Sequence, residues 1–372
     1  MRETCDYLFI IFVKNFNMKK IFLLLSSSFL FMACPPESIE PPIYNKDYGK
    51  GLYILTDNGV NFYDFDEGVL KEDIYSTVNG GSLQNPSSLN IHGNKMYIVT
   101  RNTFYRVDAE TFLSELSIGG FTDAQQCEYA NFNRFYVTDK GESEIKVIDL
   151  ISRDISGHIS TGDSVFPTDI VVNGSRSFVI NSGGDSSSDY DSTIVAIDVR
   201  NISEVLNNFA GNIITGKNPS SVVNDGNIIV LCRGIYDEND ALNNEESSFS
   251  RISAGSLSVD ANTILSGIYN ADNLCVDESD TRFYFTASDG VYWSDKSSFS
   301  SNLITDKKNP NVLISNNETY FDLTDSIYKT VNYLWCNDQD NPNYLYKLNF
   351  QTNEFEDSII LNSPIIDLEI YR

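Results

Sequence analysis

The feature that most constrains the fold of this chain is an internal repeat. Each copy has a Pro or Ala, a short alternating strand, a polar turn rich in Asn, Gly, Asp or Ser, and a second apolar strand with aromatic residues. Two such strands joined by a polar turn predict a β-hairpin. The six copies begin at Pro86, Ala124, Pro167, Pro219, Ala271 and Pro310.

The full repeat is longer than a hairpin. A third strand ending in Asp follows most hairpins, as in FYRVDAET and TIVAIDVR, and then a fourth, such as SELSIGG. The unit restarts after 38, 43, 52, 52 and 39 residues, and a four-stranded propeller blade needs ~40 to 50 residues. A β-sandwich would not repeat one unit six times, and a parallel β-helix would use shorter turns. The repeat therefore predicts a β-propeller.

A seventh unit is split between the two ends of the body. The segment from Gly51, GLYILTDNGVNFYDFDEG, has the later strands of a blade but lacks the first one, and the chain ends on PIIDLEIYR from Pro364. This last segment carries the first-strand pattern, one residue out of the usual frame. Pairing the two would bury Ile366, Leu368 and Ile370 and close the ring. We therefore predict an all-β fold, a seven-bladed β-propeller of four-stranded antiparallel blades, in which the C-terminal strand pairs with the N-terminal blade.

The N-terminal region has the build of a bacterial signal peptide. From Met18 it reads MKKIFLLLSSSFLFMAC, with two lysines, an apolar stretch and Ala33 just before Cys34. The apolar stretch is too short to span a bilayer. Because Ala-Cys endings resemble the lipobox of bacterial lipoproteins, we expect Cys34 to be lipidated. The alternative is an ordinary secretory signal with an incidental cysteine.

These features predict the domain organisation and the location. Residues 1–33 are expected to form the signal peptide, with Met18 as the true start, and residues 34–48 the lipidated cysteine and a proline-rich tether. Residues 49–372 are expected to form a single propeller. We expect a protein anchored by lipid in the outer membrane and exposed on the cell surface.

The charge of the mature chain argues against one class of partner. Removing residues 1–33 leaves 22 Lys and Arg against 50 Asp and Glu, a formal charge of −28. Phosphate binding needs clustered basic residues, so nucleic acid is a poor candidate partner. A strong negative charge favours a soluble monomer.

Catalytic, metal and cofactor motifs are largely missing from the sequence. The two histidines, His92 and His158, fall on different predicted blades, and no G-x-S-x-G, HExxH or phosphate loop occurs. We therefore predict no catalytic residue, no metal site and no cofactor, although some pair among the many carboxylates could serve a glycosidase. Four cysteines fall in apolar strand-like runs and are expected to be buried hydrophobes, while a disulfide between two of them stays open. They are Cys127, Cys232, Cys275 and Cys336.

Polar residues recur where each second strand ends, and this position predicts the candidate ligand-binding face. In propellers the turns between second and third strands share one face with the connections between blades. Three insertions rise from the same side, from Gly183, Ile235 and Asn337, and long loops on a rigid scaffold often bind ligands. The bland alternatives are solvated loops and, for Tyr236 and Trp335, core packing. The candidate residues are Asp57, Asn58, Arg101, Asn102, Asp139, Lys140, Asn181, Arg233, Tyr236, Asp289, Trp335, Asn337 and Asp338.

The body also resembles a known family. The GLYILTDNG opening after a lipoprotein signal, the GNKMYIVT hairpin, PTDIVVNGSRSFVINSGG and the repeated prolines before strands are similar to the YncE-like propeller lipoproteins of Bacteroidota, including those with the domain of unknown function 5074. Some members of this group are surface propellers that capture vitamin B12 for an outer-membrane transporter. The resemblance implies a similar binding face here.

Together these features lead to three hypotheses of function. The first is a lipid-anchored, non-enzymatic propeller that binds a ligand on its long-loop face, such as cobalamin or another nutrient, and passes it to an outer-membrane transporter. The second is a structural or adhesive surface protein that binds a protein or glycan partner. The third, and least favoured, is an enzyme such as a lyase or a lactonase.

Overall fold

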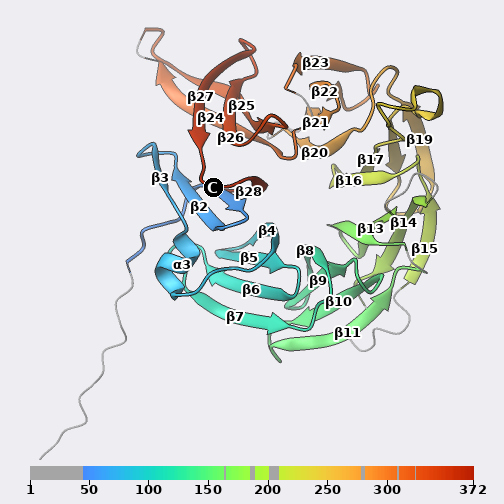
Figure 1. Cartoon of the computed structure of the whole chain (residues 1–372), viewed down its shortest axis with the longest axis horizontal. Helices are drawn as coiled ribbons and strands as arrows, with labels where there is room; N and C mark the ends of the chain where they lie inside the picture. The colour runs from blue at the N-terminus through green and yellow to red at the C-terminus, as the bar shows by residue number, and fades with distance from the viewer. Residues whose placement is uncertain are drawn as a thin grey trace, which may run out of the picture. The chain divides into compact units, whose positions relative to one another are not determined.

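Seven four-stranded antiparallel sheets make up the body of the protein, arranged around a centre (Figure 1). The computed structural model describes residues 45–162, 165–184, 189–200, 209–277, 281–307, 310–322 and 324–372, and residues 46–372 form one compact unit. The predicted all-β, seven-bladed propeller is thus confirmed. The signal peptide, Cys34 and most of the tether lie outside the described residues.

The blades are numbered here from the N-terminal one, and the strands of each are given from the centre outward. Blade 1 contains β28 (Ile365–Tyr371), β1 (Gly51–Thr56), β2 (Gly59–Asp64) and β3 (Val69–Lys71). Blade 2 contains β4 (Pro86–His92), β5 (Lys95–Thr100), β6 (Thr103–Asp108) and β7 (Ser114–Gly119). Blade 3 contains β8 (Ala124–Asn131), β9 (Arg134–Asp139), β10 (Glu144–Asp149) and β11 (Asp154–Ser160). Blade 4 contains β12 (Pro167–Asn173), β13 (Arg176–Gly183), β14 (Tyr190–Asp198) and β15 (Phe209–Ile214).

The last three blades follow the same order. Blade 5 contains β16 (Pro219–Asn224), β17 (Ile228–Cys232), β18 (Ser248–Ile252) and β19 (Val259–Ile264). Blade 6 contains β20 (Asp272–Val276), β21 (Arg282–Ala287), β22 (Gly290–Asp295) and β23 (Ser301–Thr305). Blade 7 contains β24 (Leu313–Asp322), β25 (Ile327–Asp338), β26 (Asn341–Asn349) and β27 (Glu354–Ile360).

The ring closes through the last strand, as predicted. β28 pairs with β1 in antiparallel register from Gly51 opposite Tyr371 to Thr56 opposite Ile365. A β-bulge between Ile365 and Asp367 shifts the register there, which is the physical basis of the one-residue offset in the sequence pattern. The prediction that Ile366 is buried is therefore wrong, because the bulge turns Ile365 into the core instead. Ile365, Leu368 and Ile370 are buried.

The core lies between neighbouring blades. The alternating strands bury apolar side chains on both faces of each blade, so one cluster joins Leu52, Leu368 and Trp335 of blades 1 and 7. Another cluster joins blades 5 and 6 around Phe249 and Phe283. Of the four cysteines, Cys127, Cys232 and Cys336 are buried, Cys275 is half-buried, and all four are free thiols.

Three features were not expected from the sequence. A short helix, α3 (Ile74–Asn79), connects blades 1 and 2, with Asp73 capping its first turn and Ile74 and Tyr75 buried beneath it. The β24–β25 hairpin is also longer than the corresponding hairpins, with continuous pairing from Leu313 opposite Cys336 to Asp322 opposite Ile327. Another short helical turn, η2 (Ala241–Asn243), lies in the β17–β18 loop. In the part of the chain that the structure describes, no helix has the length and apolar character needed to cross a membrane.

The prediction of a long insertion from Asn337 is wrong. β25 continues through Asp338 and β26 begins at Asn341, so the polar sequence NDQDNPN forms the ends of two strands and a tight turn. The other two insertions do leave the blades between second and third strands, in the β13–β14 and β17–β18 connections.

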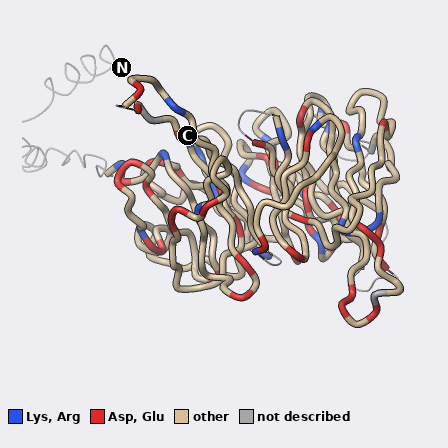
Figure 2. Tube along the Cα trace, turned by 90° about the horizontal axis from the view of Figure 1, so that it is seen from above, with Lys and Arg blue, Asp and Glu red and all other residues tan. Residues whose placement is uncertain are grey.

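Antiparallel alternation separates two faces of the propeller. The turns between second and third strands and the connections from blade to blade lie on one face, called the loop face here. The turns between first and second strands lie on the other, and so does the C-terminus after β28, at the centre of Figure 1. In Figure 2 the C-terminus and a projecting loop rich in Asp and Glu lie on opposite sides of the ring.

Candidate functional site

A polar cavity of about 320 Å³ occupies the centre of the ring, lined by the beginnings of the innermost strands. It receives side chains from all seven blades, because each innermost strand starts at the same level. Its polar lining consists of Ser87, Ser88, Gln125, Gln126, Thr168, Asp169, Ser220, Ser221, Arg233, Asp272, Asn273, Asn311 and Asp367.

A second cavity of about 380 Å³ opens above the first, toward the loop face. The two share Gln125, Thr168, Ser220 and Arg233, so they form one continuous recess, called the central recess below. The upper part is lined in addition by Lys140, Ser182, Gly183, Gly184, Tyr190, Asn218, Pro219 and Asn270.

A repeated backbone irregularity accounts for the polar lining. Six of the seven innermost strands shift register just after their first residue, as where Pro86 pairs with Thr100 but Ser88 pairs with Val99. A bulge places two successive residues opposite one partner residue, so strict alternation is lost there. The second and third residues of these strands consequently both line the recess, while the fourth is buried between blades, except in β20, where Cys275 is half-buried.

Many of these polar side chains link neighbouring blades. The hydroxyl of Ser87 donates to the carbonyl of Ala124 on the next blade (2.8 Å), and that of Ser220 donates to the carbonyl of Ala271 (3.0 Å). The backbone N–H of Leu274 in turn donates to the Ser221 hydroxyl (3.0 Å). Such bonds satisfy groups that the bulges leave outside the strand ladder.

Two aspartates make the same kind of link. Asp367 Oδ2 accepts from the backbone N–H of Leu89 on the next blade (2.8 Å), and Oδ1 accepts from the N–H of Leu368 (2.8 Å). Asp169 Oδ2 accepts from the N–H of Val222 (3.1 Å), and Oδ1 from that of Ile170 (2.8 Å). Both carboxyl groups are thus held in fixed orientations by two backbone donors each.

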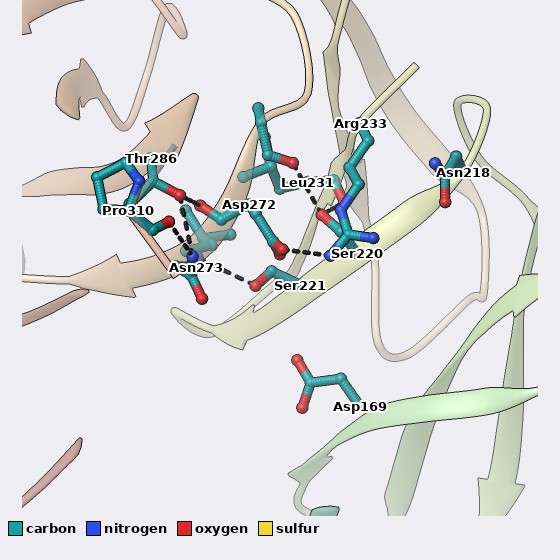
Figure 3. A network of polar contacts seen from close by, with 12 residues as sticks. Asp169, Asn218, Ser220, Ser221, Leu231, Arg233, Asp272, Asn273, Thr286 and Pro310 are labelled. Atoms are coloured by element: carbon teal, nitrogen blue, oxygen red, sulfur yellow. Dashed lines mark hydrogen bonds and ion pairs between the residues drawn. The ribbon is translucent and has the colours of Figure 1, made fainter. Parts of the chain in front are cut away.

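Arg233 and Asp272 form an ion pair on the wall of the recess (Figure 3). Arg233 follows β17, and its backbone N–H donates to the carbonyl of Asn218 (2.8 Å) while its own carbonyl accepts from the N–H of Asn270 (3.1 Å). These bonds fix the direction of its side chain. The Asp272 carboxylate raises the pKa of Arg233 further above its usual value. Figure 3 shows Asp169, on β12, across the same space from this pair.

Half-buried carboxyl groups continue below this level. Glu128 on β8 accepts from the side-chain amide of Asn90 (3.0 Å), and burial raises its pKa to about 7 despite that bond. Burial raises the pKa of Glu369 on β28 to about 8, and the charges of Asp367 and Glu128 add to the rise. For Asp169 and Asp367, burial raises the pKa to about 7 and about 6, against the lowering effect of their backbone donors.

Metal binding has no support in the described part of the chain. No three of its His, Cys, Asp and Glu side chains lie close enough together to hold a metal ion. The two histidines lie away from the recess, since His92 stacks on Tyr129 at 3.8 Å and His158 Nδ1 lies 2.7 Å from Glu144 Oε1 on an outer strand pair.

Of the candidate residues from the sequence, two line the recess. Arg233 lines both of its parts, and Lys140 lines the upper part, with its ammonium 5.8 Å from the centre of the Phe166 ring. Tyr236 does not line the recess; it is 38% exposed, and its ring lies 5.8 Å from that of Tyr269.

Five candidate residues are buried inside the blades and offer no surface to a ligand. Asp139 accepts from the backbone N–H groups of Thr122 and Asp123 and pairs with Lys146 at 2.8 Å. The same holds for Asn181, Trp335, Asn337 and Asp338. The Trp335 ring is fully buried, 5.9 Å from that of Tyr63, so its role is the alternative of core packing.

The remaining candidates lie on the loop face but outside the recess. Arg101 pairs with Asp123 at the surface, and Asp289 accepts from the Tyr292 hydroxyl (2.8 Å). Asp57, Asn58 and Asn102 are exposed turn residues.

Sequence reasoning missed most of the recess, although a signal was present. The two residues after each pre-strand Pro or Ala are polar in five of the six repeats, as in PSS, AQQ and PTD, where a buried strand would continue with apolar residues. That repeated polar pair marks the channel-lining position of blades 2 to 6.

Comparisons with known proteins support the fold. No protein-family model matches the chain, and no curated protein matches it. Among solved structures, a putative 6-phosphogluconolactonase from Bacteroides uniformis is similar, with a TM-score of 0.61, 11% identity and coverage of 86% of this chain and 99% of that one. A second putative 6-phosphogluconolactonase, from Bacteroides fragilis, has a TM-score of 0.59, 13% identity and coverage of 89% and 99%.

A third similar structure has a different described activity. It is a quinoprotein alcohol dehydrogenase-like protein from Bacteroides thetaiotaomicron, with a TM-score of 0.56, 14% identity and coverage of 87% of this chain and 76% of that one. Identities this low show a shared propeller fold and no more. Membership of the YncE-like group stays a prediction.

Proposed function

We propose that this protein is a non-enzymatic binding protein, anchored by lipid at the cell surface, that takes a small polar ligand into the central recess from the loop face. The observation that carries the proposal is the continuity of the two cavities through Gln125, Thr168, Ser220 and Arg233. Hydroxyl, amide, guanidinium and carboxylate groups converge there on a rigid scaffold, as in sites that orient a ligand by directed hydrogen bonds.

The size of the recess bears on the nature of the ligand. Parts of about 320 and 380 Å³ lie at the lower end of the range of small-molecule sites. A ligand as large as cobalamin would have to lie across the loop face, with one side group inside the recess. Delivery of the ligand to an outer-membrane transporter belongs to the same proposal.

Binding can be tested by screening polar small molecules and cobalamin against the purified body by thermal shift, followed by calorimetry. We expect Arg233→Gln to weaken a ligand of the recess at least tenfold, because its guanidinium lines both parts. Arg200→Gln is the matched control, since Arg200 is an exposed arginine paired with Asp198 on blade 4. A ligand that binds both variants as well as the parent protein would place binding elsewhere.

The anchor is tested separately. Cys34→Ala should release the protein from the membrane fraction, because stable attachment depends on acyl chains. A variant that still fractionates with membranes would contradict the lipid anchor.

The adhesive hypothesis has one observation in its favour. The β17–β18 loop exposes Leu242 almost completely (97%) and Tyr236 in part (38%), and exposed apolar side chains at a loop tip suit a macromolecular partner. Replacing residues 237–244 by two glycines separates the two functions. Loss of cell or glycan adhesion with unchanged small-molecule binding would support adhesion as a second function, and unchanged adhesion would remove it.

A further inference from the structure

The lower part of the central recess carries carboxyl groups that the proposed binding function does not explain. Asp169, Asp272 and Asp367 reach it from blades 4, 6 and 1, so they surround the space on different sides. Asp272 is paired with Arg233. Asp169 and Asp367 have no basic partner within the described residues, and each accepts hydrogen bonds from two backbone N–H groups.

An independent observation points to a ligand at the same place. Ser88 lines the lower recess, is 3% exposed, and its hydroxyl has no hydrogen-bond partner among the residues that the structure describes. The links between blades explain why. On blade 5, the equivalent residue Ser221 accepts from the backbone N–H of Leu274 on the next blade. The equivalent donor for Ser88 is the backbone N–H of Cys127, which instead donates to Gln126 Oε1 (2.9 Å). A buried hydroxyl without a partner is costly unless something else binds it.

The two free aspartates are well suited to bind a cation. Backbone donors hold each carboxyl group rigidly, yet each oxygen has a second lone pair that these bonds leave unused. Burial, and then the charges of Asp272 and Asp367, make ionisation of Asp169 costly. Glu128 and Glu369 lie one level below. Arg233 is the basic group that faces this space from above. A positive charge at the centre would therefore relieve repulsion among the carboxylates.

The spacing favours an organic cation over a metal ion. The carboxyl groups come from blades on different sides of the channel, and no three of them in the described chain are close enough for coordination. A primary ammonium has three N–H donors that diverge, and the lower recess offers three acceptor groups around one space. They are the carboxylates of Asp169 and Asp367 and the hydroxyl of Ser88.

We propose that the lower recess binds the primary ammonium group of a small amine through Asp169, Asp367 and Ser88. This inference rests on the proposed binding function and specifies the class of ligand. The amine enters from the loop face past Arg233, with its charged group deepest. Cation binding favours the ionised carboxyl groups, so the amine displaces the proton from any of these aspartates that is still protonated.

Calorimetry with a matched pair of probes tests the proposal. Butane-1,4-diamine should bind the full mature body at pH 7.5 at least tenfold more tightly than butane-1,4-diol, which has the same length but no charge. Between pH 5.5 and 7.5 the affinity for the diamine should rise about tenfold or more, because the proton that must leave costs less at higher pH. The binding heat should vary with the ionisation enthalpy of the buffer.

Variants locate the ammonium within the recess. Ser88→Ala should weaken the diamine about three- to tenfold, as expected for one hydrogen bond, and it removes no side-chain hydrogen bond found among the described residues. Asp169→Asn and Asp367→Asn should each weaken it by tenfold or more, with folding checked by circular dichroism. Asp66→Asn, at an exposed turn of blade 1, is the control for general attraction to this acidic protein and should change nothing.

The outcomes separate this inference from the proposed function. Equal binding of diamine and diol, or diamine binding that is as sensitive to Asp66→Asn as to Asp169→Asn, would overturn the amine assignment. If a neutral or anionic ligand still binds in an Arg233-dependent manner, the proposed function stands without the amine. Tighter binding of Nα-acetyl-lysine N-methylamide than of the diamine would overturn the small-amine form in favour of a lysine side chain.

Discussion

Replacing Leu368 by alanine should destabilise the whole propeller, although it changes one side chain at the end of the chain. Leu368 is 5% exposed and packs in a cluster with Leu52, Ile54 and Trp335, at the junction of blades 1 and 7. Leucine-to-alanine changes at buried sites cost ~2 to 5 kcal/mol through lost transfer free energy and the cavity left behind. We expect a loss in that range, because this junction is flanked by two rigid sheets that cannot collapse onto the space.

Ending the chain at residue 363 perturbs the pairing of β28 with β1 more strongly, because the whole of β28 is removed. It removes Ile365, Leu368 and Ile370, whose burial stabilises by ~1.5 to 3 kcal/mol each. It also removes the hydrogen bonds of β28 to β1. The sum approaches a typical net stability of ~5 to 15 kcal/mol, so the truncated chain should be largely unfolded.

Urea unfolding followed by tryptophan fluorescence and circular dichroism measures both changes. Leu242→Ala is the matched control, because Leu242 is 97% exposed in the β17–β18 loop and the same atoms are deleted without loss of burial. A midpoint for Leu368→Ala equal to that of Leu242→Ala would refute the closure as the source of stability. So would a truncated protein that unfolds as cooperatively, and at the same midpoint, as the parent.

Three further predictions concern buried groups. Stability should fall as pH rises from about 5 to about 8.5, because Glu369 has a pKa raised to about 8 and is protonated more readily in the folded than in the unfolded state. Glu369→Gln should reduce this loss of unfolding free energy by roughly 1 to 3 kcal/mol, measured from melting curves across the pH range. A pH profile unchanged by the substitution would contradict the assignment. Lys146→Met should lower the unfolding free energy by ~3 kcal/mol in urea titrations, since it leaves the buried carboxylate of Asp139, 2.8 Å from Lys146 Nζ, without a cation. A urea midpoint equal to that of the parent protein would show that the ion pair does not stabilise the fold. Trp335→Ala should lower the unfolding free energy by ~3 to 5 kcal/mol, and the melting temperature with it. In the ligand-binding assay the folded fraction should keep the affinity of the parent protein. A selective loss of affinity would give Trp335 a role in binding.

The architecture could be predicted from the sequence because the repeat carries it at several levels. A Pro or Ala before the first strand, a polar turn and an apolar second strand recur along the chain, and the missing first strand of blade 1 identified PIIDLEIYR as its partner. The error at Ile366 arose because simple alternation has no place for a bulge. Only the register of β28 against β1 shows that Ile365 occupies the buried position.

The candidate site was harder to predict, for a physical reason. The sequence pattern pointed to the loops as the binding region, but Asp139 and Asn337, two of the residues predicted there, use their polar groups in hydrogen bonds within the blades. The recess is instead lined from strands, by residues such as Gln125 and Asp169. These side chains come together only because seven strands from the whole length of the chain meet at one axis. A local sequence pattern does not show which strands meet there.

The closure of blade 1 also has a consequence for how the protein comes to be folded. β1 is the first strand of the body to be synthesised and β28 the last, so β1 keeps an open edge until the final residues have been made. Pairs this distant in sequence form slowly, and an unpaired edge is prone to associate with other chains in the meantime. The seven residues of β28 thus act as a check on completeness, because a chain that lacks them cannot close the ring and keeps an unpaired edge.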